Sequence, residues 1–141
     1  MRKINVGIDI VSSLLITLFI YAGLSKLTGI NQFSNTLSQS QLIGNYAYFF
    51  TWCILVSELF VALLLIFPRS RLSGFYLATL LMIAFAFYSV YLLLSPSRPC
   101  NCIGVFRILS WKQHLIFNIC FALLSAGGIA LCIRKRNLNA V

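Results

Sequence analysis

The chain has 141 residues, of which 60% are hydrophobic and 9% are charged, and its formal net charge is +9. So small a charged fraction excludes a water-soluble globule, because such a fold needs more polar side chains to cover its exterior. The basic residues stand in short clusters between apolar runs. Nucleic-acid binding is therefore also excluded, since it calls for a continuous basic stripe. The composition predicts an integral membrane protein.

Four apolar segments are long enough to cross a bilayer as helices, which takes about 20 residues each. They cover residues 4–27, 44–67, 72–94 and 113–133. The first segment follows two basic residues as in a secretory signal, but its length predicts a retained helix. No stretch is left over for a soluble domain. We therefore predict an all-α fold, in which residues 1–141 form one up-down bundle of four transmembrane helices.

The connector over residues 28–43 is rich in Ser, Asn and Gln, and it carries Ile30, Phe33 and Leu37 at helical spacing. This pattern fits either a short interfacial helix or a solvated loop. The next connector, residues 68–71, is too short for anything but a tight turn. The second and third helices are therefore expected to be antiparallel neighbours.

The distribution of basic residues predicts the orientation in the membrane. With both termini in the cytoplasm, seven basic residues lie on the inner side and four on the outer side. The inner set is Arg2, Lys3, Arg69, Arg71, Arg134, Lys135 and Arg136, and the outer set is Lys26, Arg98, Arg107 and Lys112. We expect a multi-pass protein of the bacterial inner membrane, whose connector between the third and fourth helices faces the periplasm.

That connector carries two thiols one residue apart, Cys100 and Cys102, between Pro99 and Gly104. A disulfide between residues i and i+2 closes a small ring, so it should be strained and easily reduced. Proline fixes the entry dihedral and glycine lets the backbone turn away. The pattern favours a redox pair, but structural or incidental cysteines fit it too. A metal centre is disfavoured, because a closed site needs four ligands and only His114 is an evident third.

Further polar residues stand inside or beside the apolar segments. His114 follows the thiol pair and is a candidate auxiliary that favours the thiolate, or a local hydrogen-bonding residue. Cys53 and Cys120 lie at similar depth, so they form either a second thiol pair or two small apolar side chains. For Lys26 we expect the ammonium to reach the headgroup region.

Asp9 and Glu58 are the two acidic residues of the chain, and both lie within apolar segments. A charge there is costly, which makes each a candidate functional residue. Each acid either pairs with a cation across the bundle, for which Arg69 and Arg71 match Asp9 in depth, or stays protonated. Straight helices would hold Lys26 and Glu58 about 20 Å apart along the membrane normal, so no ion pair is expected there. A small proton-coupled transporter that uses the two acids is one alternative function.

Several motifs together resemble those of the MauE/DoxX-like redox-associated membrane proteins. They are YAGLSKL at 21–27, Glu58 with the Leu-rich run after it, PRSR at 68–71, PCNC at 99–102 and SWKQHLIFN at 110–118, which holds Trp111, His114 and Asn118. The order and spacing of these pieces around the Cys-x-Cys make the likeness fairly specific, and it covers nearly the whole chain.

The resemblance implies a four-helix bundle akin to vitamin K epoxide reductase and a role in periplasmic disulfide chemistry. It places the family's cysteine pair on Cys100 and Cys102, and it implies a thioredoxin-like partner or the maturation of a periplasmic protein. The chain departs from the family at Ile103 and lacks the Cys-x-x-Cys that epoxide reductases use beside a quinone, so a quinone cofactor is only weakly supported. A non-catalytic membrane subunit of a larger complex is the other alternative function.

Overall fold

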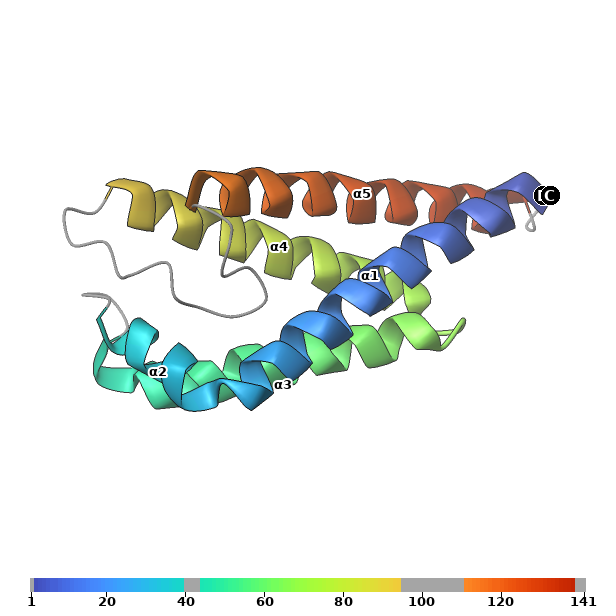
Figure 1. Cartoon of the computed structure of the whole chain (residues 1–141). Helices are drawn as coiled ribbons and strands as arrows, with labels where there is room; N and C mark the ends of the chain where they lie inside the picture. The colour runs from blue at the N-terminus through green and yellow to red at the C-terminus, as the bar shows by residue number, and fades with distance from the viewer. Residues whose placement is uncertain (1, 40–43, 95–110, 139–141) are drawn as a thin grey trace.

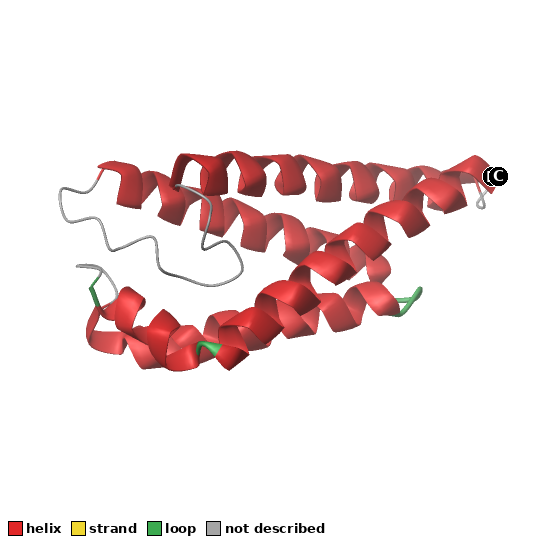
Figure 2. Cartoon of the chain, in the orientation of Figure 1, coloured by secondary structure: helices red, strands yellow, loops and turns green. Residues whose placement is uncertain are grey.

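The computed structural model describes residues 2–39, 44–94 and 111–138, with the side chain of residue 111 left out. These residues form five α-helices and one 3-10 turn, and no strand is present in the described ranges (Figure 2). The elements are α1 (Arg2–Thr28), α2 (Ile30–Ser38), η1 (Gly44–Tyr46), α3 (Ala47–Ile66), α4 (Arg71–Leu94) and α5 (Trp111–Leu138).

Four of these helices are long and apolar enough to cross a membrane, which confirms the predicted fold class. The largest difference in bounds is at α5, which continues past residue 133 to Leu138. The added turn contains Lys135 and Arg136, and basic side chains are favourable at the negative end of a helix dipole. For the connector after α1, the sequence left open a short helix or a loop, and the structure shows the short helix, α2, with Thr36 and Leu37 buried.

The arrangement of the helices decides which residues can meet (Figure 1). Helices α4 and α5 run side by side and make the most extensive helix contact, while α1 crosses the bundle obliquely and packs against both α3 and α5. The start of α1, the turn between α3 and α4, and the end of α5 lie at one end of the bundle. The end of α4, the start of α5 and helix α2 lie at the other end.

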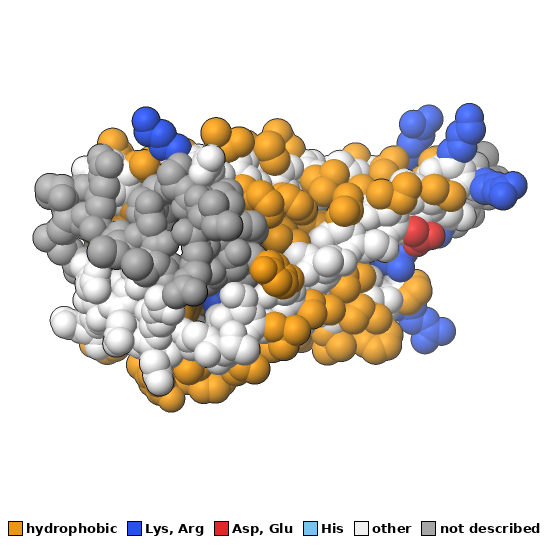
Figure 3. All heavy atoms as spheres, viewed as in Figure 1, with side chains coloured by type: hydrophobic (Ala, Val, Ile, Leu, Met, Phe, Trp, Pro, Cys, Tyr) orange, Lys and Arg blue, Asp and Glu red, His pale blue; other side chains and the backbone are white. Residues whose placement is uncertain are grey.

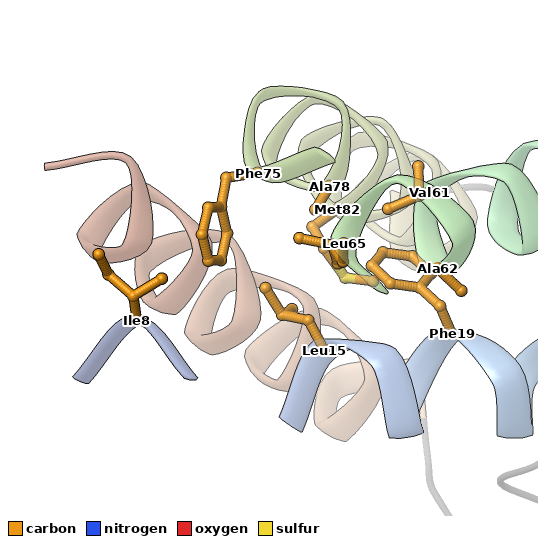
Figure 4. Packing of buried hydrophobic residues seen from close by; sticks show 9 residues of the cluster. All are labelled: Ile8, Leu15, Phe19, Val61, Ala62, Leu65, Phe75, Ala78 and Met82. Carbon is orange, nitrogen blue, oxygen red and sulfur yellow. The ribbon is translucent and has the colours of Figure 1, made fainter. Parts of the chain in front are cut away.

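The core lies where α1, α3 and α4 face each other (Figure 4). Leu15 and Phe19 of α1, Leu65 of α3 and Phe75 of α4 have no exposed surface. Small residues let the helices approach closely: a Cβ added to Gly23 would stand 2.9 Å from Leu59 Cδ2. Such close approaches are typical of membrane helices, whose association depends on packing because lipid is as apolar as leucine.

The outside of the bundle is as apolar as the core. Large hydrophobic side chains such as Ile10, Phe60, Leu80 and Leu123 are at least half exposed. Figure 3 shows hydrophobic side chains along the middle of the molecule, and most of the Lys and Arg visible on this face gather at the end where α1 begins. A surface of this kind would contact lipid, with the basic ends in the headgroup regions.

The short connector at residues 68–71 forms the tight turn that the sequence predicts. The backbone N–H of Ser70 donates to the Phe67 carbonyl at 3.1 Å, and the Ser70 hydroxyl donates to the Leu64 carbonyl at 2.9 Å. Arg71 Nε donates to the Leu65 carbonyl at 3.3 Å. These bonds satisfy carbonyl groups that the end of α3 would otherwise leave unpaired in an apolar setting.

Candidate functional site

The two charged residues at the centre of the bundle, Lys26 and Glu58, form an ion pair. Lys26 Nζ lies 2.6 Å from Glu58 Oε1, and the two side chains are 16% and 1% exposed. The prediction that Lys26 reaches the headgroups and stands far from Glu58 is therefore wrong. Removing either partner would leave the other as an uncompensated charge in a medium that solvates charge poorly.

The tilt of α1 explains this difference. Straight helices parallel to the membrane normal would place the end of α1 at the membrane surface. In the structure α1 crosses α3 obliquely, and α2 follows it directly at Ile30 (Figure 1). The end of α1 therefore stays within the bundle, where Lys26 reaches Glu58 beyond the midpoint of α3.

Aromatic rings from two other helices surround the ammonium. Lys26 Nζ lies 5.6 Å from the ring centroid of Phe33 on α2 and 5.8 Å from that of Phe85 on α4. Both distances fall within the range of cation–π attraction. Lys26 therefore has three stabilising partners, from α2, α3 and α4.

The carboxylate is less completely satisfied than the ammonium. Glu58 Oε1 accepts the bond from Lys26, whereas Oε2 is buried and has no hydrogen-bond partner in the part of the chain that the structure describes. An unpaired buried oxygen of this kind is unusual in a folded protein. It marks the position at which the bundle offers an unused acceptor.

Helix α5 adds the predicted auxiliary residue to this region. His114 lies on the first turn of α5, half-buried, and interacts electrostatically with Lys26. Asn118 lies one turn further along α5 and is 7% exposed. The structure thus joins Lys26 to Glu58 and places His114 within electrostatic reach of Lys26.

The cysteines within the helices do not meet. Cys53 on α3 and Cys120 on α5 are free, and both are exposed on the outside of the bundle. Nothing in the structure supports the second thiol pair. Cys132 is also free and lies toward the opposite end of α5.

The predicted redox pair, Cys100 and Cys102, lies outside the described residues, as do Pro99 and Gly104. The backbone of Trp111 begins α5, and its side chain is not described. The helices on either side, α4 ending at Leu94 and α5 beginning at Trp111, do fix where the connection starts and ends. Both points lie at the end of the bundle that carries α2 (Figure 1).

At the other end of the bundle Asp9 pairs with Arg71. Arg71 Nη1 lies 2.6 Å from Asp9 Oδ1, which confirms one of the two partners expected for this acid. The aspartate is 64% exposed, so the pair is far more open than Lys26–Glu58. It ties the start of α1 to the start of α4.

One polar contact between helices was missed from the sequence. The hydroxyl groups of Thr79 on α4 and Ser125 on α5 lie 2.7 Å apart, and Ser125 is fully buried. Small polar residues inside apolar segments were the available signal, but the sequence does not say which of them face each other. In the described ranges no group of His, Cys, Asp and Glu could hold a metal ion.

A family model described as methylamine utilisation protein MauE matches residues 4–131. The chain belongs to the MauE family. The match confirms the resemblance seen in the motifs and includes residues from all four membrane-spanning helices. The comparison with curated proteins gave no match, and neither did the comparison with solved structures.

Proposed function

We propose that this MauE-family protein exchanges disulfides with a thioredoxin-like partner or with a periplasmic protein under maturation, through Cys100 and Cys102. It does so in the bacterial inner membrane with both termini in the cytoplasm. The observation that carries the proposal is the family match over residues 4–131, because a redox or maturation role is in keeping with that family.

The arrangement of the helices supports this proposal. With four spans, both termini lie on one side, and the connection between α4 and α5 lies on the other. Basic residues are concentrated at the start of the first span and at the end of the last span, and this favours a cytoplasmic position for both termini. The thiols then face the periplasm, where disulfides persist.

The exchange itself conserves electrons and atoms. A thiolate of the partner attacks one sulfur of the Cys100–Cys102 disulfide, which forms a mixed disulfide and releases the other cysteine of the pair as a thiolate. The second thiolate of the partner then attacks the partner's own sulfur in the mixed disulfide, which leaves the partner with a disulfide and Cys100 and Cys102 as a dithiol. His114, at the start of α5, is the auxiliary expected to favour the thiolate form.

Differential alkylation of intact cells tests the redox state and the side of the membrane. A membrane-impermeant maleimide should label Cys100 and Cys102 only after mild reduction. The matched control is a variant in which Cys53, Cys120 and Cys132 are replaced by serine, and it should behave as the natural chain does. Thiols that are always free, or that react only from the cytoplasmic side, would contradict the proposal.

A trapping experiment separates redox function from a purely structural role. In Cys102→Ser, the remaining thiol should hold a partner as a mixed disulfide that disappears on reduction. In Cys100→Ser/Cys102→Ser, no adduct should form although the protein still inserts. Full activity in this double variant would favour the non-catalytic subunit instead.

A further inference from the structure

The unused carboxylate oxygen of Glu58 is the starting point for a second site. Glu58 is 1% exposed, and its Oε2 atom has no partner among the described residues, although Oε1 is bound by Lys26. A buried acceptor that is left unpaired costs free energy comparable to a lost hydrogen bond. The fold nevertheless keeps this oxygen buried, which points to a ligand that Oε2 binds reversibly.

The charges around Glu58 restrict what that ligand is. Helix α1 contributes Lys26, whose charge acts on Glu58. Helix α2 has no titratable residue, and α5 contributes His114, which also interacts with Lys26. An ionised Lys26–Glu58 pair is neutral overall. A metal cation would be repelled by the ammonium and an anion by the carboxylate, so the ligand is a proton or a neutral hydrogen-bond donor.

The aromatic rings decide between these two. If Glu58 takes up a proton, Lys26 loses its counter-charge while it stays buried. Phe33 and Phe85 then still stabilise the ammonium, because cation–π attraction strengthens where water is excluded. A site that binds a neutral hydrogen-bond donor would leave Glu58 ionised, so Lys26 would keep its counter-charge and would not need the aromatic rings. The three contacts of Lys26 thus fit a pair that survives loss of the carboxylate charge.

We propose that Glu58 is a proton-binding site inside the bundle, which alternates between an ion pair with Lys26 and a neutral carboxyl beside a charged Lys26. One proton adds to the carboxylate and the pair changes from neutral to a single positive charge, while no electron moves. The bond from Lys26 to Oε1 persists in both states, since a carboxyl oxygen still accepts. The site does not depend on the chemistry of Cys100 and Cys102.

Infrared difference spectroscopy tests this proposal on the full chain in lipid vesicles. Acidification should produce the carbonyl stretching band of a protonated, non-hydrated carboxyl. Glu58→Gln should abolish that band and Asp9→Asn should leave it in place. The assignment is unambiguous because Asp9 and Glu58 are the only side-chain carboxyl groups in the sequence.

Two further variants test the roles of the partners. Lys26→Met removes the opposing charge, so the proton affinity of Glu58 should rise about 10- to 1,000-fold. Phe85→Leu removes one aromatic face from the ammonium in both states, so it should destabilise the bundle and change that affinity by less than about twofold. Phe87→Leu is the matched control on α4, since Phe87 is 72% exposed, and it should change nothing.

A hydrophobic carbodiimide gives an independent measurement on the natural chain, because it modifies carboxyl groups that are protonated in apolar surroundings. Mass spectrometry should find the adduct on Glu58, more of it at acidic pH, and none on Asp9. Absence of both a titrating band and an adduct would mean that Glu58 stays ionised and that Oε2 serves a neutral donor. A band that persists in Glu58→Gln would also overturn the proposal.

Discussion

Two adjacent glycines on α5 offer a sharp test of the packing. A Cβ added to Gly128 would lie 2.5–2.8 Å from three ring atoms of Phe75, whereas a Cβ added to Gly127 meets nothing within 4 Å. Phe75 has no exposed surface, so its ring has little room to move. Gly128→Ala should therefore destabilise the bundle and Gly127→Ala should not.

The magnitude follows from two opposing terms. Alanine favours a helix interior over glycine by about 0.8–1.0 kcal/mol, and this gain is common to both variants. Overpacking a core costs typically about 1–3 kcal/mol, and this cost applies to Gly128 alone. The common term cancels, so the free energies of unfolding of the two variants should differ by about 1–3 kcal/mol.

Unfolding of the purified protein by a denaturing detergent in mixed micelles, followed by circular dichroism, measures this difference. In a Phe75→Leu background, Gly128→Ala should lower the free energy of unfolding much less than it does in the natural chain, because leucine leaves space for the methyl group. Equal stabilities for Gly127→Ala and Gly128→Ala would refute the packing of α4 against α5 described above.

Three further predictions concern polar contacts. Lys26→Met should cost about 3–5 kcal/mol, while Lys26→Met/Glu58→Met should be close to neutral, as detergent unfolding will show. The loss of unfolding free energy in Lys26→Met should grow as pH rises, because Glu58 then ionises without a counter-charge, whereas a protonated Glu58 needs none. A loss of stability that does not depend on pH would contradict this. Asp9→Asn should change stability by at most about 1 kcal/mol by the same assay, because Arg71 holds an aspartate that is 64% exposed. Ser125→Ala should cost about 0.6 kcal/mol, and a loss of several kcal/mol would contradict the small contribution expected of this hydroxyl, which bonds Thr79 and also donates to the Ala122 carbonyl.

The helices and the Asp9–Arg71 pair could be predicted because both depend on position along the chain. An apolar run of more than 20 residues defines a spanning helix by its length alone. Asp9 and Arg71 each lie close to an end of their helices, so a small error in tilt does not separate them. Depth along the membrane normal was sufficient information there.

The Lys26–Glu58 pair could not be predicted because it depends on the tilt of α1. Tilt is set by packing against neighbouring helices, and a hydropathy pattern does not contain it. Gly23 was the available signal, since it allows α1 to approach α3 at Leu59, but a close approach does not give the crossing angle. The contact with Glu58 follows only once that angle is known.

The directions in which Cys53 and Cys120 point could not be read from the sequence either. Neither α3 nor α5 has one face that is markedly more polar than the others, so no polar stripe marks which face is turned inward. Equal depth therefore left the angle around each helix axis undetermined. In the structure both thiols lie on the outward faces.

The oblique course of α1 has a consequence for assembly. Near its beginning, Gly7 faces Leu131 of α5, and near its end Gly23 faces Leu59 of α3. Part of the surroundings of α1 is thus supplied by α5, the helix furthest from it along the described sequence. A chain that lacks α5 would expose the side of α1 at Gly7 to lipid, so we expect it to assemble the bundle incompletely.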